Sequence, residues 1–316
     1  MGEGVLVVGA ANFDIKGRMQ HSPKLTSSNR ALIRTSFGGV ARNIAENLAR
    51  LGVPVTLLTA VGDDYAGEDL LDSANEVGVD VSRALVVEGE ITGTYLAVLD
   101  EGGDLFIGLD DLRVLRHVTP EYLQRNEDVF RGCALVALDL NLSEAALRTA
   151  IHLARAHHKP ICVDPTSAMR APSLRPYLHL VDVVTPNIAE AEALLDESPI
   201  LTSDDALIAA RQLVRRGVKV AVITQAERGA CYATEDESGQ FPALRVQIAD
   251  TTGAGDALTA LVIFGLLNQF PISDALQLGL RAAALTLRST ETVSPELSLD
   301  RLYGLVEDYA PANDEV

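Results

Sequence analysis

Short hydrophobic runs alternate along the chain with segments in which apolar residues recur at helical spacing. The runs are rich in β-branched and aliphatic residues, a composition typical of buried strands. Such an alternation predicts a largely parallel sheet with helices on both faces. The predicted strands are Val5–Val8, Val55–Leu58, Leu135–Leu138, Ile161–Val163, Val181–Val184 and Val218–Ile223, and the predicted helices include Ala41–Leu51, Leu70–Val77, Glu144–Ala156 and Asp204–Arg215.

Two stretches depart from this alternation, at residues about 13–36 and 92–110. The first is mostly polar and lacks a helical pattern. In the second, a turn at Glu101-Gly-Gly joins two β-type runs, Thr94–Asp100 and Asp104–Gly108, which predicts a hairpin. We expect both stretches to form a small sheet outside the main layer, as a lid over a substrate. An ordinary edge hairpin without a gating role is the alternative.

Composition narrows the function classes. The 316 residues are 47% hydrophobic, and no linker, repeat or low-complexity segment divides residues 1–316, so we expect one domain. A formal net charge of −18 disfavours nucleic acid and anionic membranes as partners. The chain starts directly with a predicted strand and has no apolar run of bilayer length, which predicts a cytoplasmic protein. Its cysteines, Cys133, Cys162 and Cys231, lie in or beside apolar runs without metal-ligand spacing, so we expect them to be buried and reduced.

The strongest chemical signal is Asp250-Thr-Thr-Gly253-Ala254-Gly255-Asp256, followed by an apolar, helix-like run. Small residues at the start of a helix let free backbone N–H groups approach a phosphate, and the helix dipole favours its negative charge. Asp256, in the first helical turn, is placed to accept the proton of an attacking hydroxyl. On its own, the stretch could also be a tight loop with a carboxylate at a helix N-terminus.

A second glycine-containing segment opens the predicted helix near the N-terminus. Gly38 and Gly39 permit close backbone approach to a sugar hydroxyl, and Asn43 lies one helical turn further on. Asn12 and Asp14 follow the first strand, and a carboxylate such as Asp14 accepts two neighbouring hydroxyls well. Without further information, these two residues could simply form a strand-end turn.

Both segments together resemble the two signatures of the PfkB (ribokinase-like) kinase family. Gly38-Gly39-x-x-x-Asn43-x-Ala45, with Gly52 and Gly62, matches the first signature, and Asp250–Asp256 matches the second. The resemblance implies a three-layer α/β/α fold with a largely parallel central sheet and a small β-sheet lid, and ATP-dependent phosphoryl transfer to an alcohol. Two departures are Leu261, where the family prefers Ala or Gly, and Ala226, where a nucleotide-contacting turn usually has Gly.

The resemblance also assigns roles to single residues. Gly253, Ala254 and Gly255 would form the anion hole beside Asp256. Glu190 would meet Mg²⁺ through water, and the loop with Asp250 and Thr252 would hold a monovalent cation such as K⁺. Family members often form homodimers through the lid sheet, and we expect one here. The residues implied for ATP are Asn187, Glu190, Thr224, Gly229, Gly253 and Gly255, and those implied for the sugar are Asn12, Asp14, Gly38, Gly39 and Asn43.

Less general segments resemble those of bacterial pseudouridine kinases, among them Gly38–Gly52, Thr94–Asp100, Leu138–Leu147 and Val163–Arg170. This similarity implies pseudouridine as the acceptor. A protein group that accepts the extra N–H of its C-linked uracil would be left unpaired by other nucleosides. The candidate base-reading residues are Asp111, Asn141, Thr166 and Arg170; Arg170 could instead be a surface cation, and Asp110-Asp111 a solvated loop end.

Other functions stay open at this point. A ribokinase, an adenosine kinase or another sugar kinase would use the same chemistry on a different acceptor. A nucleotide-binding regulator could keep the fold without turnover, although Asp256 and the Gly-Ala-Gly turn argue against this. A dinucleotide-binding dehydrogenase is disfavoured, because no Gly-x-Gly-x-x-Gly follows the first strand.

Overall fold

A nine-stranded sheet forms the centre of the computed structural model, which describes residues 4–103, 105–196 and 199–308. Its strands run parallel from one edge as far as β13, and β14 and β15 extend it antiparallel. In spatial order the strands are β15 (Ser238–Phe241), β14 (Ala230–Ala233), β13 (Val220–Thr224), β12 (Val183–Val184), β11 (Ile161–Asp164), β10 (Leu135–Asp139), β1 (Val5–Val8), β4 (Val55–Leu58) and β6 (Val79–Asp80).

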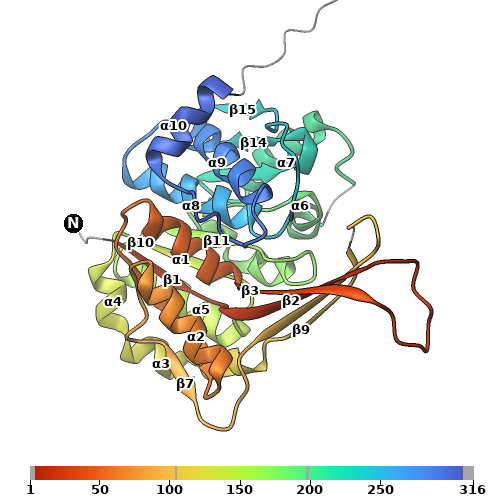
Figure 1. Ribbon diagram of the computed structural model, residues 1–316. Coiled ribbons are helices and arrows are strands. Elements are labelled where there is room, and N and C mark those ends of the chain that lie inside the picture. The colour runs from red at the N-terminus through yellow and green to blue at the C-terminus, as the bar shows by residue number, and fades with distance from the viewer. Residues whose placement is uncertain (1–3, 104, 197–198, 309–316) are drawn as a thin grey trace, which may run out of the picture.

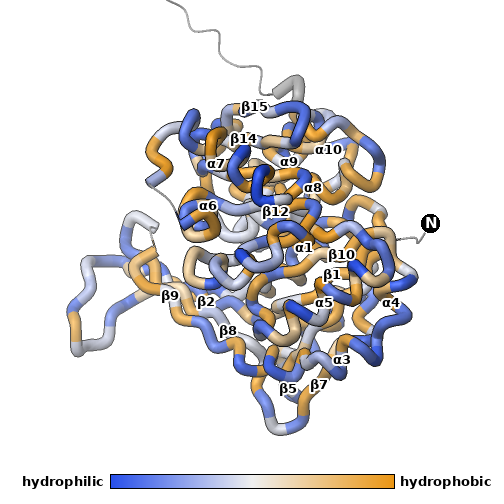
Figure 2. Tube along the Cα trace, turned by 180° about the vertical axis from the view of Figure 1, so that it is seen from behind, coloured by the Kyte–Doolittle hydropathy of each residue, from blue (hydrophilic) through white to orange (hydrophobic). Residues whose placement is uncertain are grey.

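Helices cover both faces of this sheet (Figure 1). Alternate residues of a strand point to opposite faces, so Leu6 and Val8 of β1 enter one core cluster and Val5 and Val7 the other. The buried strands appear as hydrophobic segments in Figure 2. The predicted three-layer arrangement is thereby confirmed. One cluster includes α3 (Pro120–Arg125), α4 (Glu127–Gly132), α5 (Glu144–Ala156), α6 (Ile188–Leu195) and α7 (Ser203–Arg215), and the other α1 (Val40–Arg50), α2 (Tyr65–Glu76), α8 (Ala254–Leu267), α9 (Ile272–Leu287) and α10 (Leu299–Asp308).

Local capping explains where several elements begin. The Ser143 side chain accepts a hydrogen bond from the Ala146 N–H and so starts α5 at the predicted residue. Two predicted strands start later than expected, because the amides of Val181 and Val218 close the turns of the preceding helices. None of the helices in the described part of the chain has the length and apolar character that a membrane span needs. The 3₁₀ segments are η1 (Arg113–His117), η2 (Ala171–Leu180) and η3 (Ala226–Arg228).

A separate four-stranded sheet projects from the main body, as predicted, and is called the lid sheet below (Figure 1). Its β2 and β8 are parallel, and the outer pairs are antiparallel. Asp104, predicted in the last of these strands, lies outside the described residues. The strands in order are β3 (Ala31–Gly38), β2 (Asn12–Met19), β8 (Thr94–Leu99) and β9 (Leu105–Asp111), and a further parallel pair is β5 (Ala60–Gly62) with β7 (Leu85–Val87).

The register of the lid sheet gives it two different faces. Asp14, Tyr95 and Asp110 are neighbours across β2, β8 and β9, so their side chains share one face. Gly17, Val98 and Ile107 are neighbours on the opposite face. The first face brings Asp14, Tyr95 and Asp110 to the cavity, whereas the second carries exposed apolar residues such as Ile33 and Ile107.

Candidate active site

A cavity of about 370 Å³ lies where the lid sheet meets the carboxyl ends of β10 and β11 and the start of α8. Ligands of open α/β sheets commonly bind at these strand ends. The cavity brings together residues from opposite ends of the sequence. It is lined by the predicted residues Asn12, Asp14, Gly39, Asn43, Asn141, Thr166, Arg170, Thr252 and Asp256, and by the unpredicted residues Val40, Tyr95, Asp110, Leu112 and Ser167.

Asp256 is the third residue of α8, at the floor of this cavity. Gly253 caps the helix with φ +86°, and a Cβ there would meet the Thr292 carbonyl oxygen at 1.9 Å, so this position requires glycine. Beside it, Gly255 faces open space. The N–H groups of the first helical turn have no partner within the helix, so the arrangement offers free donors next to a carboxylate.

Burial raises the pKa of Asp256 to about 7. A hydrogen bond from the Asn43 side-chain amide, 2.7 Å from the carboxylate, acts in the opposite direction. The negative charges of Asp139, Asp14 and Glu190 add to the rise. Asp256 therefore titrates near neutral pH, as a general base should.

Asn12 and Asp14 lie side by side at the start of β2. The Asn12 amide donates to the Asp14 carboxylate over 2.5 Å. Burial raises the pKa of Asp14 to about 6, although Lys16 and Asn12 act in the opposite direction. Gly38 lies directly against Asp14, since a Cβ at position 38 would approach its carboxylate to 2.4 Å. Gly38 thus makes room for a carboxylate of the cavity and does not line the cavity itself.

Asp139, at the end of β10, organises the cavity without lining it, and the sequence reasoning assigned it no role. Its buried carboxylate accepts hydrogen bonds from the N–H groups of Ala10, Ala41 and Asn141, at 2.7, 3.1 and 2.8 Å. One side chain therefore joins the β1–β2 loop, the start of α1 and the loop after β10. A carboxylate that directly follows a buried hydrophobic strand was the signal that could have identified it.

Of the two neighbouring aspartates at the end of β9, only Asp110 lines the cavity. Asp111 points to the other face of the strand and pairs with Arg113 at 2.7 Å, which holds its pKa at about 2. Asp110 lies 3.4 Å from the Arg170 guanidinium, so this ion pair joins the lid sheet to the main body across the cavity. Asp111, which was predicted to bind the nucleobase, therefore does not line the cavity, and Asp110 lines it instead.

The loop after β11 presents Thr166 in a strained conformation. Thr166 has φ +67°, which is unfavourable for a β-branched residue. It is held there because its amide donates to the Asp164 carboxylate at 2.8 Å and its Oγ1 accepts from the Leu140 N–H at 3.1 Å. The side chain is thereby fixed between the strand ends that also carry Asn141.

Asn187 and Glu190, predicted on the nucleotide side, form a capping box at the start of α6. The Asn187 side chain accepts from the Glu190 N–H, and both carboxylate oxygens of Glu190 accept from Asn187. Thr224, at the end of β13, is bridged to Asn187. Both predicted nucleotide segments therefore lie next to each other.

The turn after β13 shows the effect of the departure at Ala226. Ala226 adopts φ +51°, the left-handed conformation that glycine takes without strain. Gly229 follows with φ +95°, where a Cβ would lie 2.0 Å from the Phe241 carbonyl oxygen. The turn thus keeps a glycine-like backbone despite the alanine.

Asp250, predicted at a monovalent cation, is engaged by protein groups. One carboxylate oxygen accepts from Lys16 at 2.7 Å and the other from the Thr252 N–H at 2.8 Å. Burial by itself would raise its pKa, but these hydrogen bonds outweigh it and the pKa is lowered. In the described residues, no group of three or more His, Cys, Asp or Glu side chains is arranged to hold a metal ion.

Comparison with known proteins identifies the family. The model of the pfkB family of carbohydrate kinases matches residues 3–298. The chain belongs to the pfkB family. It is therefore a phosphotransferase that acts on a hydroxyl group of a sugar or nucleoside, and the predicted resemblance is confirmed.

Individual pfkB relatives differ in the acceptor that they are named for. The chain is 33% identical to the pseudouridine kinase of Escherichia coli K12 over 305 residues, 96% of each protein. It is also 33% identical to the guanosine-inosine kinase of Exiguobacterium acetylicum, covering 94% of this chain and 99% of the relative. The structure of Arabidopsis thaliana ribokinase with ribose and ATP has the same fold, with a TM-score of 0.84, 21% identity and 97% and 99% coverage.

Proposed function

We propose that this pfkB kinase transfers the γ-phosphoryl group of ATP to the 5′-hydroxyl of pseudouridine, with Asp256 as the general base. The observation that carries the proposal is the position of Asp256 at the N-terminus of α8, in the same cavity as Asn12 and Asp14. A carboxylate with a pKa of about 7 and a set of free helix N–H groups are the two elements that such a transfer needs.

The proposed reaction is a single in-line displacement. Asn12 and Asp14 hold the ribose hydroxyls, and Gly39 and Asn43 border the sugar. The 5′-oxygen attacks the γ-phosphorus while Asp256 accepts its proton, and the bond to the departing ADP oxygen breaks. The N–H groups that follow Gly253 stabilise the charge that builds up on the transferred group. The lid sheet would limit the access of water during this step.

Mg²⁺ fits this site only as a partner of the nucleotide. Glu190 is buried and both of its oxygens already accept hydrogen bonds from Asn187, so this carboxylate would reach the ion through water. Mg²⁺ bound together with ATP would supply positive charge that stabilises the departing ADP. The carboxylate of Asp250 does not fit as a ligand of K⁺ while Lys16 holds it. Thr252 and the backbone carbonyl oxygens of the loop would then have to be the ligands of a monovalent cation.

We favour pseudouridine over other acceptors because one end of the cavity carries the negative charge of Asp110 and the positive charge of Arg170. Asp110 can accept the extra N–H of the C-linked uracil, and Arg170 can donate to one of its carbonyl oxygens. Asn141 and Thr166 line the same cavity and complete the polar set. A nucleoside without that N–H would lose this hydrogen bond to Asp110.

The outer face of the lid sheet supports the homodimer that we propose. Ile33, Ile107 and Leu109 are 63%, 47% and 54% exposed and lie on the face turned away from the cavity. A second copy of this face would cover them.

A substrate panel with an ADP-release readout tests the proposed function. The purified protein, ATP and Mg²⁺ are combined in turn with pseudouridine, uridine, guanosine, inosine, adenosine, ribose and fructose. We expect kcat/KM for pseudouridine to exceed that for uridine by about 10²-fold or more. Equal or better turnover of ribose or of a purine nucleoside would refute pseudouridine as the substrate, and no turnover of any acceptor would favour a nucleotide-binding regulator.

A further inference from the structure

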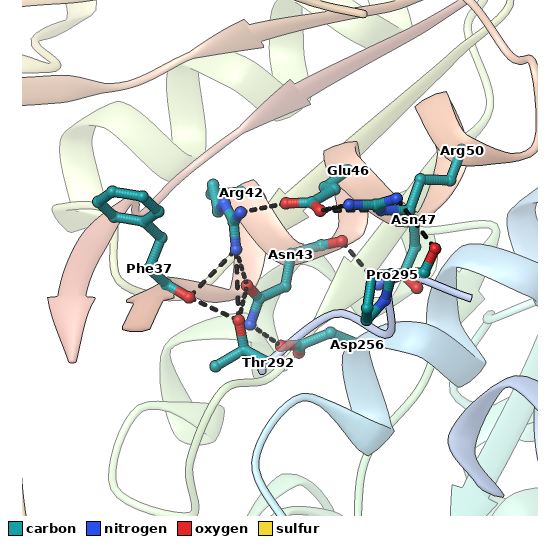
Figure 3. A network of polar contacts seen from close by, with 9 residues as sticks. All are labelled: Phe37, Arg42, Asn43, Glu46, Asn47, Arg50, Asp256, Thr292 and Pro295. Atoms are coloured by element: carbon teal, nitrogen blue, oxygen red, sulfur yellow. Dashed lines mark hydrogen bonds and ion pairs between the residues drawn. The ribbon is translucent and has the colours of Figure 1, made fainter. Parts of the chain in front are cut away.

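A buried polar network adjoins Asp256 (Figure 3). Asn43 is its centre: the amide nitrogen donates to Asp256, and the amide oxygen points to Arg42 and Thr292. Arg42 Nη1 lies 3.2 Å and Thr292 Oγ1 3.0 Å from this oxygen. Arg42 directly precedes Asn43 in the first glycine-containing segment, whereas Thr292 lies outside both segments, and neither residue was predicted to have a role.

The two neighbours decide which way the Asn43 amide points. A guanidinium has only donors, so Arg42 can be satisfied here only by an oxygen. If the amide were turned round, its NH₂ group would face the guanidinium of Arg42 and its oxygen would face the carboxylate of Asp256. Both contacts would then be repulsive, because a donor would meet a donor and an acceptor an acceptor. The orientation with the NH₂ group on Asp256 is therefore enforced.

Arg42 is itself held in place from three sides. Its Nη2 pairs with Glu46, its Nη1 also donates to the Phe37 carbonyl oxygen at 3.1 Å, and its guanidinium lies 5.9 Å from the Phe37 ring. Glu46 is in turn bound by Arg50, with Nε 2.9 Å from Oε1. The charge of Arg42 is thus neutralised on the side remote from Asn43.

Thr292 connects this network with the anion loop. Its hydroxyl lies 2.5 Å from the Phe37 carbonyl oxygen as well as 3.0 Å from Asn43, so its single proton has two acceptors within reach. Its backbone carbonyl packs against Gly253. Thr292 therefore contacts both Asn43, which binds Asp256, and the turn that starts α8.

We propose that Arg42 and Thr292 are positioning residues for phosphoryl transfer, which lock the Asn43 amide so that it donates to Asp256 and keeps the base ionised. The proposal rests on the proposed role of Asp256 but not on the identity of the acceptor. The other titratable groups around Asp256 are the carboxyls of Asp14 of β2, Asp139, Asp164 and Glu190, which favour its protonated form, whereas the hydrogen bond from Asn43 favours the ionised form.

The test is the pH dependence of kcat for Arg42→Met and Thr292→Val, measured with pseudouridine and saturating MgATP. If the Asn43 amide no longer donates to Asp256, the pKa of Asp256 should rise. The acidic limb of the kcat–pH profile, where kcat falls as the base is protonated, should then move to higher pH. For Arg42→Met we expect a shift of about one pH unit, which corresponds to about a tenfold loss of kcat below the limb and little loss at pH 9. Thr292→Val should shift less, since Arg42 still donates to Asn43.

Two control variants separate positioning from a structural role. Glu46→Gln weakens the hold on Arg42 but leaves its contact with Asn43, and Thr292→Ser keeps the hydroxyl. Both should keep the acidic limb of the wild type, although Glu46→Gln should lower the melting temperature. A uniform loss at every pH in Arg42→Met, or an equal shift in Glu46→Gln, would overturn the proposal. If Arg42→Met does not fold, identical profiles of Thr292→Val and Thr292→Ser would overturn it.

Failure of the proposed function would look different in the same experiments. If the wild type does not phosphorylate pseudouridine, the profiles are measured with whichever of ribose or guanosine it does phosphorylate, because the network acts on Asp256 and not on the acceptor. An Asp256→Asn variant with normal turnover would refute the role of Asp256 whatever the profiles show.

Discussion

The Asn43 side-chain amide donates a hydrogen bond to the Asp256 carboxylate over 2.7 Å, between residues 213 positions apart. This contact joins the first turn of α1 to the first turn of α8 and places the two family segments in one site. Burial and neighbouring carboxylates raise the pKa of Asp256 to about 7, and the amide limits that rise. The chemistry proposed for the protein depends on this balance.

Replacing Asp256 by Asn removes the proposed base and keeps the shape of the side chain. We expect kcat to fall by about 10³-fold, while the Kd for ATP stays within about threefold, because the N–H groups of the α8 start remain. Turnover by the ADP-release assay and ATP binding by calorimetry check this. Near-native kcat would show that another group accepts the proton.

The pKa of Asp256 also predicts how activity depends on pH. A base must be ionised, and ionisation of a carboxyl whose pKa is raised to about 7 is complete only above that pH. We therefore expect kcat/KM to fall about tenfold per pH unit below about pH 7 and to level off above it. A profile that stays flat between pH 5 and pH 8 would contradict the raised pKa or the role of the residue.

Asp110 and Asp111 form a matched pair for testing how the base is read. Asp110→Ala should raise the KM for pseudouridine by about tenfold or more and reduce the preference over uridine, since it removes a charged acceptor from the cavity. Asp111→Ala removes the same group from the opposite face of β9 and should change KM less than about twofold. Steady-state kinetics with pseudouridine and uridine measure these changes in KM. A larger effect of Asp111→Ala than of Asp110→Ala would show that the nucleobase does not bind at Asp110.

The proposed homodimer can be tested with two adjacent residues of β3. Ile33 lies on the outer face of the lid sheet and Leu32 on the face toward the cavity, with similar exposures of 63% and 58%. Ile33→Glu should convert a dimer into a monomer, because it places a charge in the apolar contact. Leu32→Glu should leave the dimer intact in sedimentation equilibrium. Dissociation by both variants, or a monomeric wild type, would contradict dimerisation through the outer face.

Ala226→Gly should stabilise the protein. Ala226 has φ +51°, and relief of this left-handed strain is worth about 1 kcal/mol in the free energy of unfolding, partly offset by the greater freedom of glycine in the unfolded chain. Urea denaturation monitored by circular dichroism measures the difference. Gly229→Ala is the opposite change and should destabilise, because its Cβ would meet the Phe241 carbonyl oxygen. A less stable Ala226→Gly protein would show that the turn tolerates alanine without strain.

Much of the fold could be predicted from local pattern. Strands β1 and β4 and helix α5 have the predicted bounds, because hydrophobic runs and a Ser143 cap define them locally. Strands β14 and β15, at one end of the sheet, were not predicted. Each pairs antiparallel with the strand before it in sequence, β14 with β13 and β15 with β14, and the sequence of β15, Ser-Gly-Gln-Phe, has no hydrophobic run that would mark a strand.

The candidate site could be predicted in part. Asp256 and Asn43 were predicted from the two glycine-containing segments and Asn12 and Asp14 from the family resemblance, and all four line one cavity. The choice between Asp110 and Asp111 could not be made, because it depends on strand register, which decides the face to which each side chain points. Tyr95 was missed for the same reason.

What the sequence by itself determined is therefore the set of elements and the two segments that carry the phosphoryl-transfer chemistry, since hydrophobic period, glycine placement and helix starts act over a few residues. What only the tertiary structure decided is how distant groups set one another's orientation and charge. Asp139 holds loops from three parts of the chain, and Thr292 meets Asn43 across 249 positions. Burial, hydrogen bonding and like charges shift the pKa of a carboxyl only once folding has brought these groups together.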